Sequence, residues 1–138
     1  MAITHTESSV LWSTAYFAAV GANSTQTSDA LALDATCVNA QITLKAENGG
    51  TPASGDVIYF YLLQSSGDPD GNAVADEYDT TGHATFLAAL DTTVDATAIK
   101  TVPLPLPQKG LKVYAEGTTA TTTQSITVSA VVLEQRAA

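Results

Sequence analysis

The chain has little cysteine, little positive charge and no long apolar run. Its 138 residues include one cysteine, Cys37, so an intramolecular disulfide is excluded. Cys37 lies between apolar residues in LALDATCVNA, and we expect it to be a buried small side chain and not a nucleophile. No apolar stretch reaches the about 20 residues that a membrane-spanning helix requires. A chain of this length can bury a core in one domain without a disulfide or a metal.

The charge balance is strongly acidic. There are 5 Lys and Arg residues against 14 Asp and Glu residues, which gives a formal net charge of −9. Nucleic acids and anionic membranes are bound through basic surfaces, so neither is expected as a partner. Charged residues make up only 14% of the chain, and its surface must therefore consist largely of Thr, Ser, Asn, Gln and Ala. Such a surface can pack against a neighbour with little desolvation of charge, which favours an assembly protein over a freely diffusing enzyme.

The first 20 residues form a segment that we treat separately. Residues 10–20 are mostly apolar but follow no positively charged region, so we expect no signal peptide and a protein made in a cytoplasm. We interpret residues 1–20 as an N-terminal arm or first strand, and residues 21–138 as a single β-sandwich domain. Trp12, Tyr16 and Phe17 are candidate interface residues on a neighbouring subunit or a larger assembly. The alternative is that they complete the core of the domain.

A two-residue period dominates the rest of the chain. Apolar and polar residues alternate in AQITLKAE (40–47), LKVYAE (111–116) and SITVSAVVLE (125–134), which indicates strands with one buried face. Residues 84–91 alternate in the same way, with a short helix as the alternative. Frequent turn signals separate about seven or eight such segments. We predict an all-β, antiparallel β-sandwich that is jelly-roll-like or immunoglobulin-like, although the immunoglobulin disulfide is excluded.

Two segments depart from simple alternation. DVIYFYLLQ (56–64) is apolar on both faces, which predicts a central strand that is covered on both sides, or one that is covered by a neighbouring subunit. TVPLPLPQKG (101–110) places prolines at alternate positions and cannot be an interior strand, because proline has no N–H to donate. We expect it to run along an edge or across the sandwich, with Leu104 and Leu106 pointing together toward apolar surface.

SSGDPDGNAVADEYD (65–79) is the most acidic stretch, and its spacing resembles that of a calcium-binding loop. Three features argue against that interpretation. Ala73 stands where the loop needs glycine, and Asp79 stands where it needs the longer Glu that binds through both oxygens. A strand also leads into the segment where a helix should end. We therefore predict a solvated loop between strands and no metal site. The side chains that would have been the ligands are Asp68, Asp70, Asn72, Asp76 and Asp79.

No arrangement for catalysis is visible in the sequence. His5 lies near the N-terminus and His83 follows a TTG turn, but neither accompanies a nucleophile motif. There is no glycine-rich phosphate loop and no cysteine cluster. We predict a protein that is not an enzyme, with no catalytic residues and no cofactor.

Three segments between residues 55 and 136 carry a resemblance to small structural proteins of tailed bacteriophages. They are GDVIYFYLLQSSGDPDGN (55–72), VPLPLP (102–107) and GLKVYAEGTTATTTQSITVSAVVLEQR (110–136). In those proteins a strand that ends in YLL enters an acidic, glycine-rich loop, and a proline-containing crossover precedes a final Thr/Ala-rich hairpin. The resemblance extends over roughly residues 55–136.

The resemblance implies a capsid decoration (cement) protein. Such proteins are β-sandwich or jelly-roll subunits that sit on the expanded head as oligomers, often trimers, and contact the major capsid protein. It therefore implies a location on the virion surface after synthesis in the host cytoplasm, and it transfers no catalytic residue. The alternatives are a tail or baseplate structural protein, and a carbohydrate-binding module in which the acidic loop or Tyr59, Tyr61 and Tyr78 contact sugar.

Overall fold

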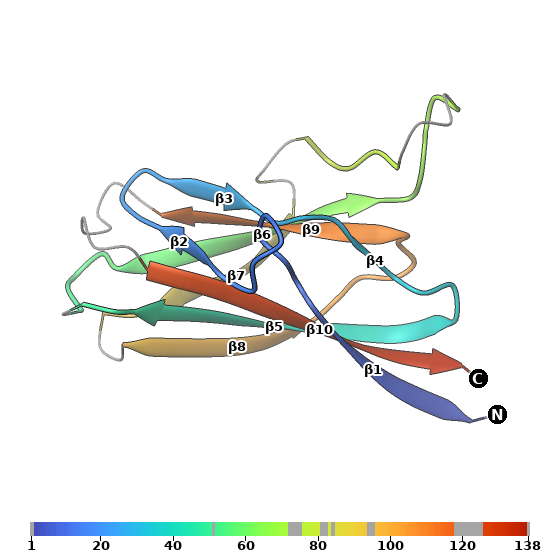
Figure 1. Cartoon of the computed structure of the whole chain (residues 1–138), viewed down its shortest axis with the longest axis horizontal. Coiled ribbons are helices and arrows are strands. Elements are labelled where there is room, and N and C mark those ends of the chain that lie inside the picture. Colours follow the sequence, from blue (N-terminus) through green and yellow to red (C-terminus); the bar gives the residue numbers. More distant parts are fainter. Residues whose placement is uncertain are drawn as a thin grey trace.

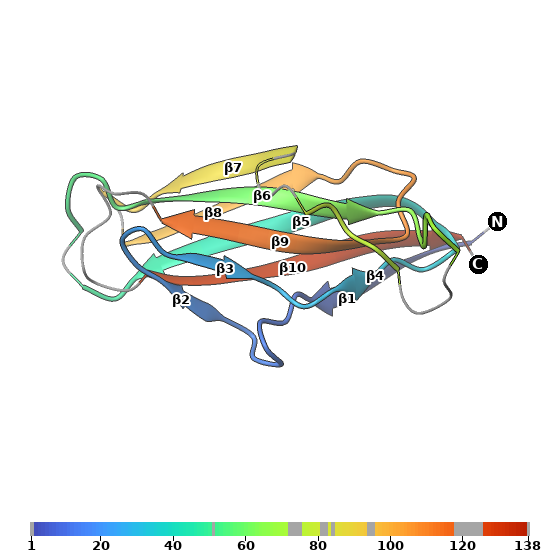
Figure 2. The same cartoon turned by 90° about the horizontal axis from the view of Figure 1, so that it is seen from above.

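The protein is a sandwich of two antiparallel sheets (Figures 1 and 2). The computed structural model describes residues 2–50, 52–71, 76–80, 83, 85–93, 96–117 and 126–137. These residues form ten strands. The described part of the chain contains no helix that is long and apolar enough to cross a membrane.

Each sheet has five strands, and in each the strand order differs from the sequence order. The first sheet has the order β1-β10-β5-β8, with β2 also paired to β10. Its strands are β1 (Ile3–Ser9), β2 (Ala18–Val20), β5 (Cys37–Asn48), β8 (Thr97–Pro103) and β10 (Ile126–Ala137). The second sheet has the order β3-β9-β6-β7, with β4 also paired to β9. Its strands are β3 (Thr25–Thr27), β4 (Leu31–Ala32), β6 (Val57–Ser65), β7 (Thr85–Asp91) and β9 (Gly110–Gly117).

The strand pairs are nested within one another along the chain. β6 pairs with β7, β5 with β8, β3 and β4 with β9, and β1 and β2 with β10. Because β1 and β2 share one partner and β3 and β4 share another, the ten segments occupy eight strand positions. This nesting, with alternate pairs in opposite sheets, is the jelly-roll arrangement. The prediction of an antiparallel, jelly-roll-like sandwich is therefore confirmed.

The first two strand positions are each interrupted, one by a left-handed turn and the other by a side-chain hydrogen bond. Between β1 and β2 the chain turns at Ser13 and Thr14, whose φ angles of 48° and 70° lie in the left-handed region. Between β3 and β4, the hydroxyl oxygen of Ser28 accepts a hydrogen bond from the Val113 N–H at 2.8 Å. A side chain thus replaces the backbone partner at that point, and these interruptions raise the number of segments above the predicted seven or eight.

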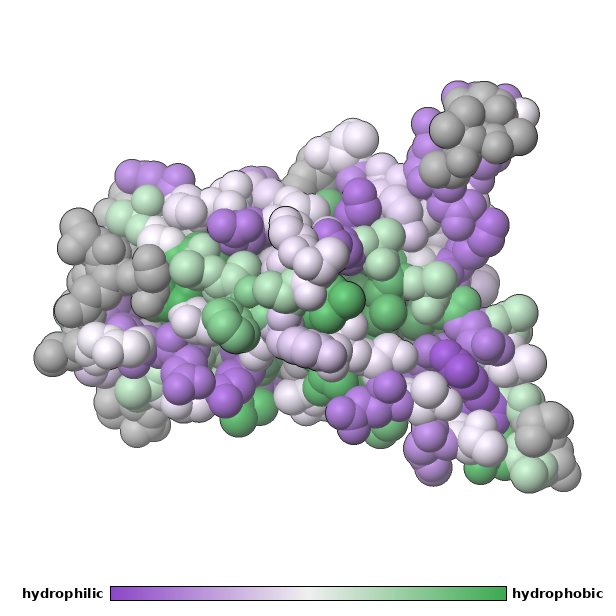
Figure 3. All heavy atoms as spheres, in the orientation of Figure 1, coloured by the Kyte–Doolittle hydropathy of each residue, from purple (hydrophilic) through white to green (hydrophobic). Residues whose placement is uncertain are grey.

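The core consists mainly of alternate residues of the strands, as the two-residue period predicted for β5, β9 and β10. Figure 3 shows hydrophobic residues in a band between the two layers, with more polar residues above and below it. The inward side chains of the four longest strands are almost fully buried and pack across the interior. They are Ile42, Leu44 and Ala46 of β5, Ile58, Phe60 and Leu62 of β6, Leu111, Val113 and Ala115 of β9, and Ile126, Val128 and Val132 of β10.

The first 20 residues are part of the sandwich, as the first-strand interpretation proposed. β1 pairs with β10 from Ile3↔Ala137 to Ser9↔Val131, so the two ends of the chain lie side by side (Figure 1). Val10, Trp12 and Val20 belong to the hydrophobic core. Removing this segment would therefore expose core residues and leave β10 without a partner on one side.

Three further predictions concern residues 84–91, strand β6 and the proline segment. The described residues of the 84–91 segment form strand β7 and not a helix, and Ala84 lies outside the described residues. β6 is interior, between β9 and β7. Its predicted two-sided cover is only partial, because one face packs on the first sheet while Tyr59 and Tyr61 on the other are half-exposed. β8 is an edge strand, and beyond it Leu104 is buried and Leu106 packs against the core.

Buried polar groups hold both ends of β5 in place. At one end, the Asn48 amide donates a hydrogen bond to Asp56 at 2.9 Å, and the Thr92 hydroxyl donates to the Asp56 carbonyl at 2.7 Å. This network joins the β5–β6 connection to the residue that follows β7. At the other end lies Glu134 of β10, which pairs with Ala40 of β5.

Glu134 is a fully buried carboxylate. The Arg136 guanidinium donates a hydrogen bond to it at 2.8 Å, and the Asp34 backbone N–H donates another at 3.1 Å. Burial by itself would raise the pKa of Glu134, but these donors and the positive charge of Arg136 outweigh it and lower the pKa below its usual 4.5. Nearby Cys37 is only partly buried, where the sequence predicted a buried side chain, and this burial together with the charge of Glu134 raises its pKa.

We expect Glu134→Gln to lower the free energy of unfolding at pH 7 by about 1–3 kcal/mol, because it leaves Arg136 without its buried partner. The lowered pKa means that the carboxylate stabilises the fold above pH 4.5, and that this contribution is lost as the pH falls through the folded-state pKa. Urea unfolding at several pH values should show a weaker acid dependence in the variant. Glu47→Gln, at an exposed ion pair, is the matched control and should leave the profile unchanged.

Candidate functional site

The three aromatic residues near the N-terminus have different environments. Trp12 is 3% exposed and belongs to the core, whereas Tyr16 and Phe17 are 69% and 61% exposed. A tight turn produces this difference, since the Trp12 N–H donates to the Ala15 carbonyl at 2.7 Å. The Thr14 N–H donates to the Asp29 carboxylate at 2.9 Å and fixes the turn to the β3–β4 connection. Trp12 is therefore a core residue, which was the alternative to an interface role, whereas Tyr16 and Phe17 lie at the surface.

Tyr16 borders a hollow on the outer face of the first sheet, which we call the Tyr16 hollow. Its volume is about 290 Å³, and it is open to solvent. On its opposite side Ile99 is 61% exposed. The charged side chain at its margin, Lys45, is paired with Glu47 at 3.3 Å. The residues that line the hollow are Ser9, Tyr16, Thr43, Lys45, Ile99, Ser129, Ala130 and Val131.

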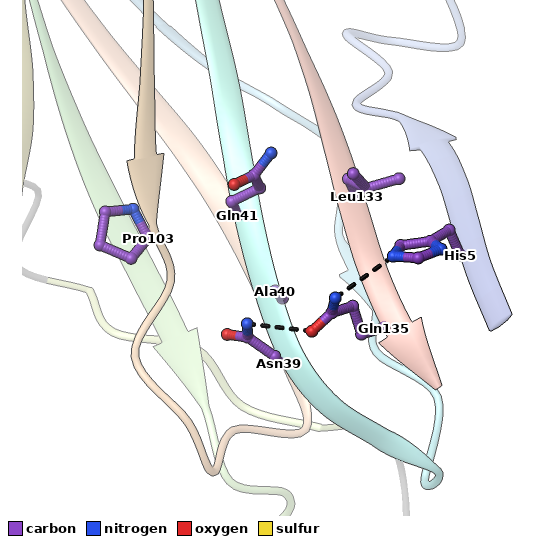
Figure 4. A pocket seen from close by; sticks show the side chains of 7 residues that line it. All are labelled: His5, Asn39, Ala40, Gln41, Pro103, Leu133 and Gln135. Carbon is purple, nitrogen blue, oxygen red and sulfur yellow. Dashed lines mark hydrogen bonds between the residues drawn. The ribbon is translucent and has the colours of Figure 1, made fainter. Parts of the chain in front are cut away.

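A second hollow, of about 220 Å³, lies farther along the same face toward the chain ends (Figure 4). Asn39, Gln135 and His5 cross it in a row from β5 through β10 to β1. The Asn39 amide donates to Gln135 at 3.1 Å, and the Gln135 nitrogen lies 3.2 Å from Nε2 of His5. These side chains are uncharged amides and an imidazole that already bond to one another. None of the described residues that line this hollow carries a carboxylate, a hydroxyl or a thiol.

The outer face of the second sheet carries aromatic rings, which we call the ring cluster: Tyr61, His83, Phe86 and Tyr114. The centroid of the Tyr61 ring lies 4.7 Å from that of His83, 5.7 Å from that of Phe86 and 6.1 Å from that of Tyr114. The first two pairs meet edge to face, which is a favourable geometry for aromatic rings. Partial burial and the charge of Glu116 raise the pKa of Tyr61. At the margin, Nε2 of His83 lies 2.8 Å from the Glu116 carboxylate.

Strand register creates this cluster. Tyr61 of β6 lies between Tyr114 of β9 and Phe86 of β7. Of the three tyrosines proposed from the sequence as sugar contacts, Tyr61 is at the centre of the cluster and Tyr59 lies on the same face. Tyr78 lies elsewhere, with the Lys112 ammonium 5.0 Å from its ring centroid. The alternation in residues 111–116 predicted that Tyr114 faces away from the core. The outward direction of Tyr61 and its pairing with Tyr114 were not visible in the sequence, because residues 56–64 are apolar on both faces.

The acidic loop extends away from the body of the sandwich beyond β6 (Figure 1). Carboxylate oxygens of Asp68, Asp70 and Glu77 lie within 4.8 Å of one another. Asp76 instead accepts a hydrogen bond from Lys109 at 2.9 Å, and Asp79 accepts one from the Gln64 N–H at 3.0 Å.

The spacing that resembled a calcium loop is therefore not realised in the described residues. Asp76 and Asp79 instead hold the second half of the loop to the sandwich, through Lys109 and Gln64. Glu77, which was not among the proposed ligands, joins Asp68 and Asp70. Asn72 and Ala73 lie outside the described residues.

Comparisons with known proteins give no family for this chain. No family model matches it, and no curated protein matches it. Among solved structures, it is similar to BtGH115A, a family GH115 4-O-methyl-α-glucuronidase with specificity for decorated arabinogalactans. The sequence identity is 12% and the TM-score is 0.44. The match covers 93% of this chain but only 16% of that enzyme, and a similarity of this size supports no argument about function.

We expect truncation of Trp12, Tyr16 and Phe17 to alanine to change the free energy of unfolding by very different amounts. Trp12→Ala should lower the free energy of unfolding by about 3–5 kcal/mol, because it leaves a cavity in the core. Tyr16→Ala and Phe17→Ala should each change it by less than about 0.5 kcal/mol, because both side chains are exposed. Urea unfolding followed by far-UV circular dichroism measures all three, and a large loss in Tyr16→Ala would contradict the assignment.

We also expect the acidic loop to bind calcium weakly or not at all. Calcium takes six to eight oxygen ligands, and Asp76 and Asp79 bond to other groups. Calorimetric titration with CaCl₂ should give no binding at micromolar concentrations. Micromolar binding that is lost in Asp68→Asn but kept in Asp91→Asn, at an exposed carboxylate outside the loop, would show that the loop is a metal site.

Proposed function

We propose that this protein is a bacteriophage capsid decoration protein, which binds the major capsid protein on the expanded head as a homo-oligomer. The resemblance of residues 55–136 to small phage structural proteins suggests this role. The observation that carries the proposal is the outer face of the first sheet, which has the properties of a packing surface.

The central strands of that face present almost no charge. The structure describes β5 and β10 in full. Among the outward residues of β5 from Asn39 to Glu47 and of β10 from Thr127 to Gln135, the charged ones are Lys45 and Glu47, which pair with each other. The rest are amides, hydroxyls and aliphatic side chains. A face of this kind can be covered with little desolvation of charge. The outward residues are Asn39, Gln41, Thr43, Lys45 and Glu47 of β5, and Thr127, Ser129, Val131, Leu133 and Gln135 of β10.

The Tyr16 hollow supplies anchors for such a contact. Tyr16 and Ile99 are large, exposed side chains on either side of the hollow, whose floor is formed by short side chains of β5 and β10. Tyrosine is enriched at protein interfaces because it combines apolar area with a hydroxyl and loses little conformational entropy. We assign this hollow to the contact between copies of the chain, and we propose that the oligomer is a closed trimer.

Light scattering of the purified protein at tens of micromolar should show a trimer. The double variant Tyr16→Ser with Ile99→Ser should be largely monomeric, because it removes both anchors. Phe86→Ser is the matched control: it removes an exposed hydrophobic side chain from the second sheet and should leave the trimer intact. A monomeric wild type that also fails to co-sediment with mature heads would overturn the proposal. Counting copies per virion tests a head location against the tail or baseplate alternative.

A further inference from the structure

The ring cluster lies on the sheet face that the proposed oligomer contact leaves free. Phe86 is 57% exposed and the His83 side chain is 54% exposed, so these rings are available to a ligand. Outward positions of antiparallel sheets are ordinarily polar. Three neighbouring strands instead direct an aromatic side chain to one point, and a further ring comes from the β6–β7 connection. A cluster of exposed rings with polar groups at its margin is characteristic of a binding site.

The polar groups beside the rings can bond to hydroxyl groups. The Glu116 carboxylate accepts hydrogen bonds, and the imidazole of His83, 2.8 Å away, can donate or accept according to its tautomer. At the end of β6, the Gln64 amide donates to the Thr85 hydroxyl at 3.3 Å, which adds an amide and a hydroxyl near Phe86.

We propose that the ring cluster binds a neutral sugar unit of a glycan. A pyranose ring has an apolar face of C–H groups that packs on aromatic rings, and hydroxyl groups at its edge that both donate and accept hydrogen bonds. Phe86 and Tyr61 would contact the apolar face of the sugar, while Glu116 and His83 would bond to its hydroxyls.

The charges at the site argue against other ligands. Glu116 would repel a phosphate, a sulfate or a uronic acid. The cation on the same strand, Lys112, is directed to the ring of Tyr78 and not to the cluster. A protein that covered the cluster would have to desolvate the pair formed by His83 and Glu116, which is costly without new hydrogen bonds. A sugar hydroxyl replaces water at both groups and avoids most of that cost.

An array of neutral and acidic oligosaccharides, probed with the wild-type protein, should identify at least one neutral ligand. Isothermal titration with that oligosaccharide should then show about tenfold weaker binding by Phe86→Ala, because a ring that packs on the ligand is lost. Glu116→Gln should also weaken binding, since a charged acceptor becomes neutral. Phe17→Ala is the matched control, because Phe17 is exposed to a similar degree (61%) but lies outside the cluster.

Several outcomes would overturn the inference: no neutral ligand on the array, binding confined to acidic glycans, or unchanged affinity in Phe86→Ala. Binding of purified capsid protein that Phe86→Ala abolishes, with a negative array, would assign the cluster to a protein partner instead. Thermal melting of each variant checks that the sandwich is folded. These measurements do not depend on the oligomeric state, so the glycan site and the proposed decoration role can fail independently.

Discussion

The pairing of the last strand with the first ones is the constraint on which the rest of the structure depends. β10 has β5 on one side and β1 and β2 on the other, so the C-terminal segment is held by residues from the first third of the chain. The pairing of β1 and β2 with β10 is the outermost of the nested pairs, and the other pairs lie within it along the chain. Because so many contacts join distant parts of the sequence, no half of the chain contains a complete sheet of its own.

This arrangement gives the two outer faces different chemical characters. On the first sheet, β5 and β10 present short, mostly uncharged side chains around the Tyr16 hollow. On the second sheet, β6, β7 and β9 present aromatic rings beside an ion pair. One molecule thus offers a surface suited to a flat protein contact and another suited to a small, hydroxyl-rich ligand. In the proposed decoration protein, the first face would join copies of the chain and the second would remain free to bind a glycan.

The buried polar groups show how the sandwich tolerates charge in its interior. Glu134 is fully buried at one end of β5, yet it remains ionised because Arg136 and the Asp34 N–H bond to it. At the other end, the Asn48 amide and the Ala53 N–H donate to the Asp56 carboxylate, and the Thr92 hydroxyl donates to the Asp56 backbone carbonyl. Each network connects segments that are far apart in the sequence, so it specifies how the connections close the two ends of the sandwich.

The sequence by itself determined which residues of β5, β9 and β10 face the core, because a two-residue period leaves little choice once one face is buried. On β7 the alternation of Phe86 with the buried Ala88 and Leu90 was misleading, because an irregularity in the β6–β7 register accompanies the outward position of Phe86. The sequence also determined that the proline segment lies at an edge and that residues 84–91 favour a strand. Tertiary structure alone decided the nesting of the strand pairs, since alternation does not reveal which strand is the neighbour of another. It placed Trp12 in the core and Tyr16 on the surface, because a left-handed turn at Ser13 and Thr14 separates them. It also brought Tyr61, Phe86 and Tyr114 together, since only the register of three strands from distant parts of the chain places their rings side by side.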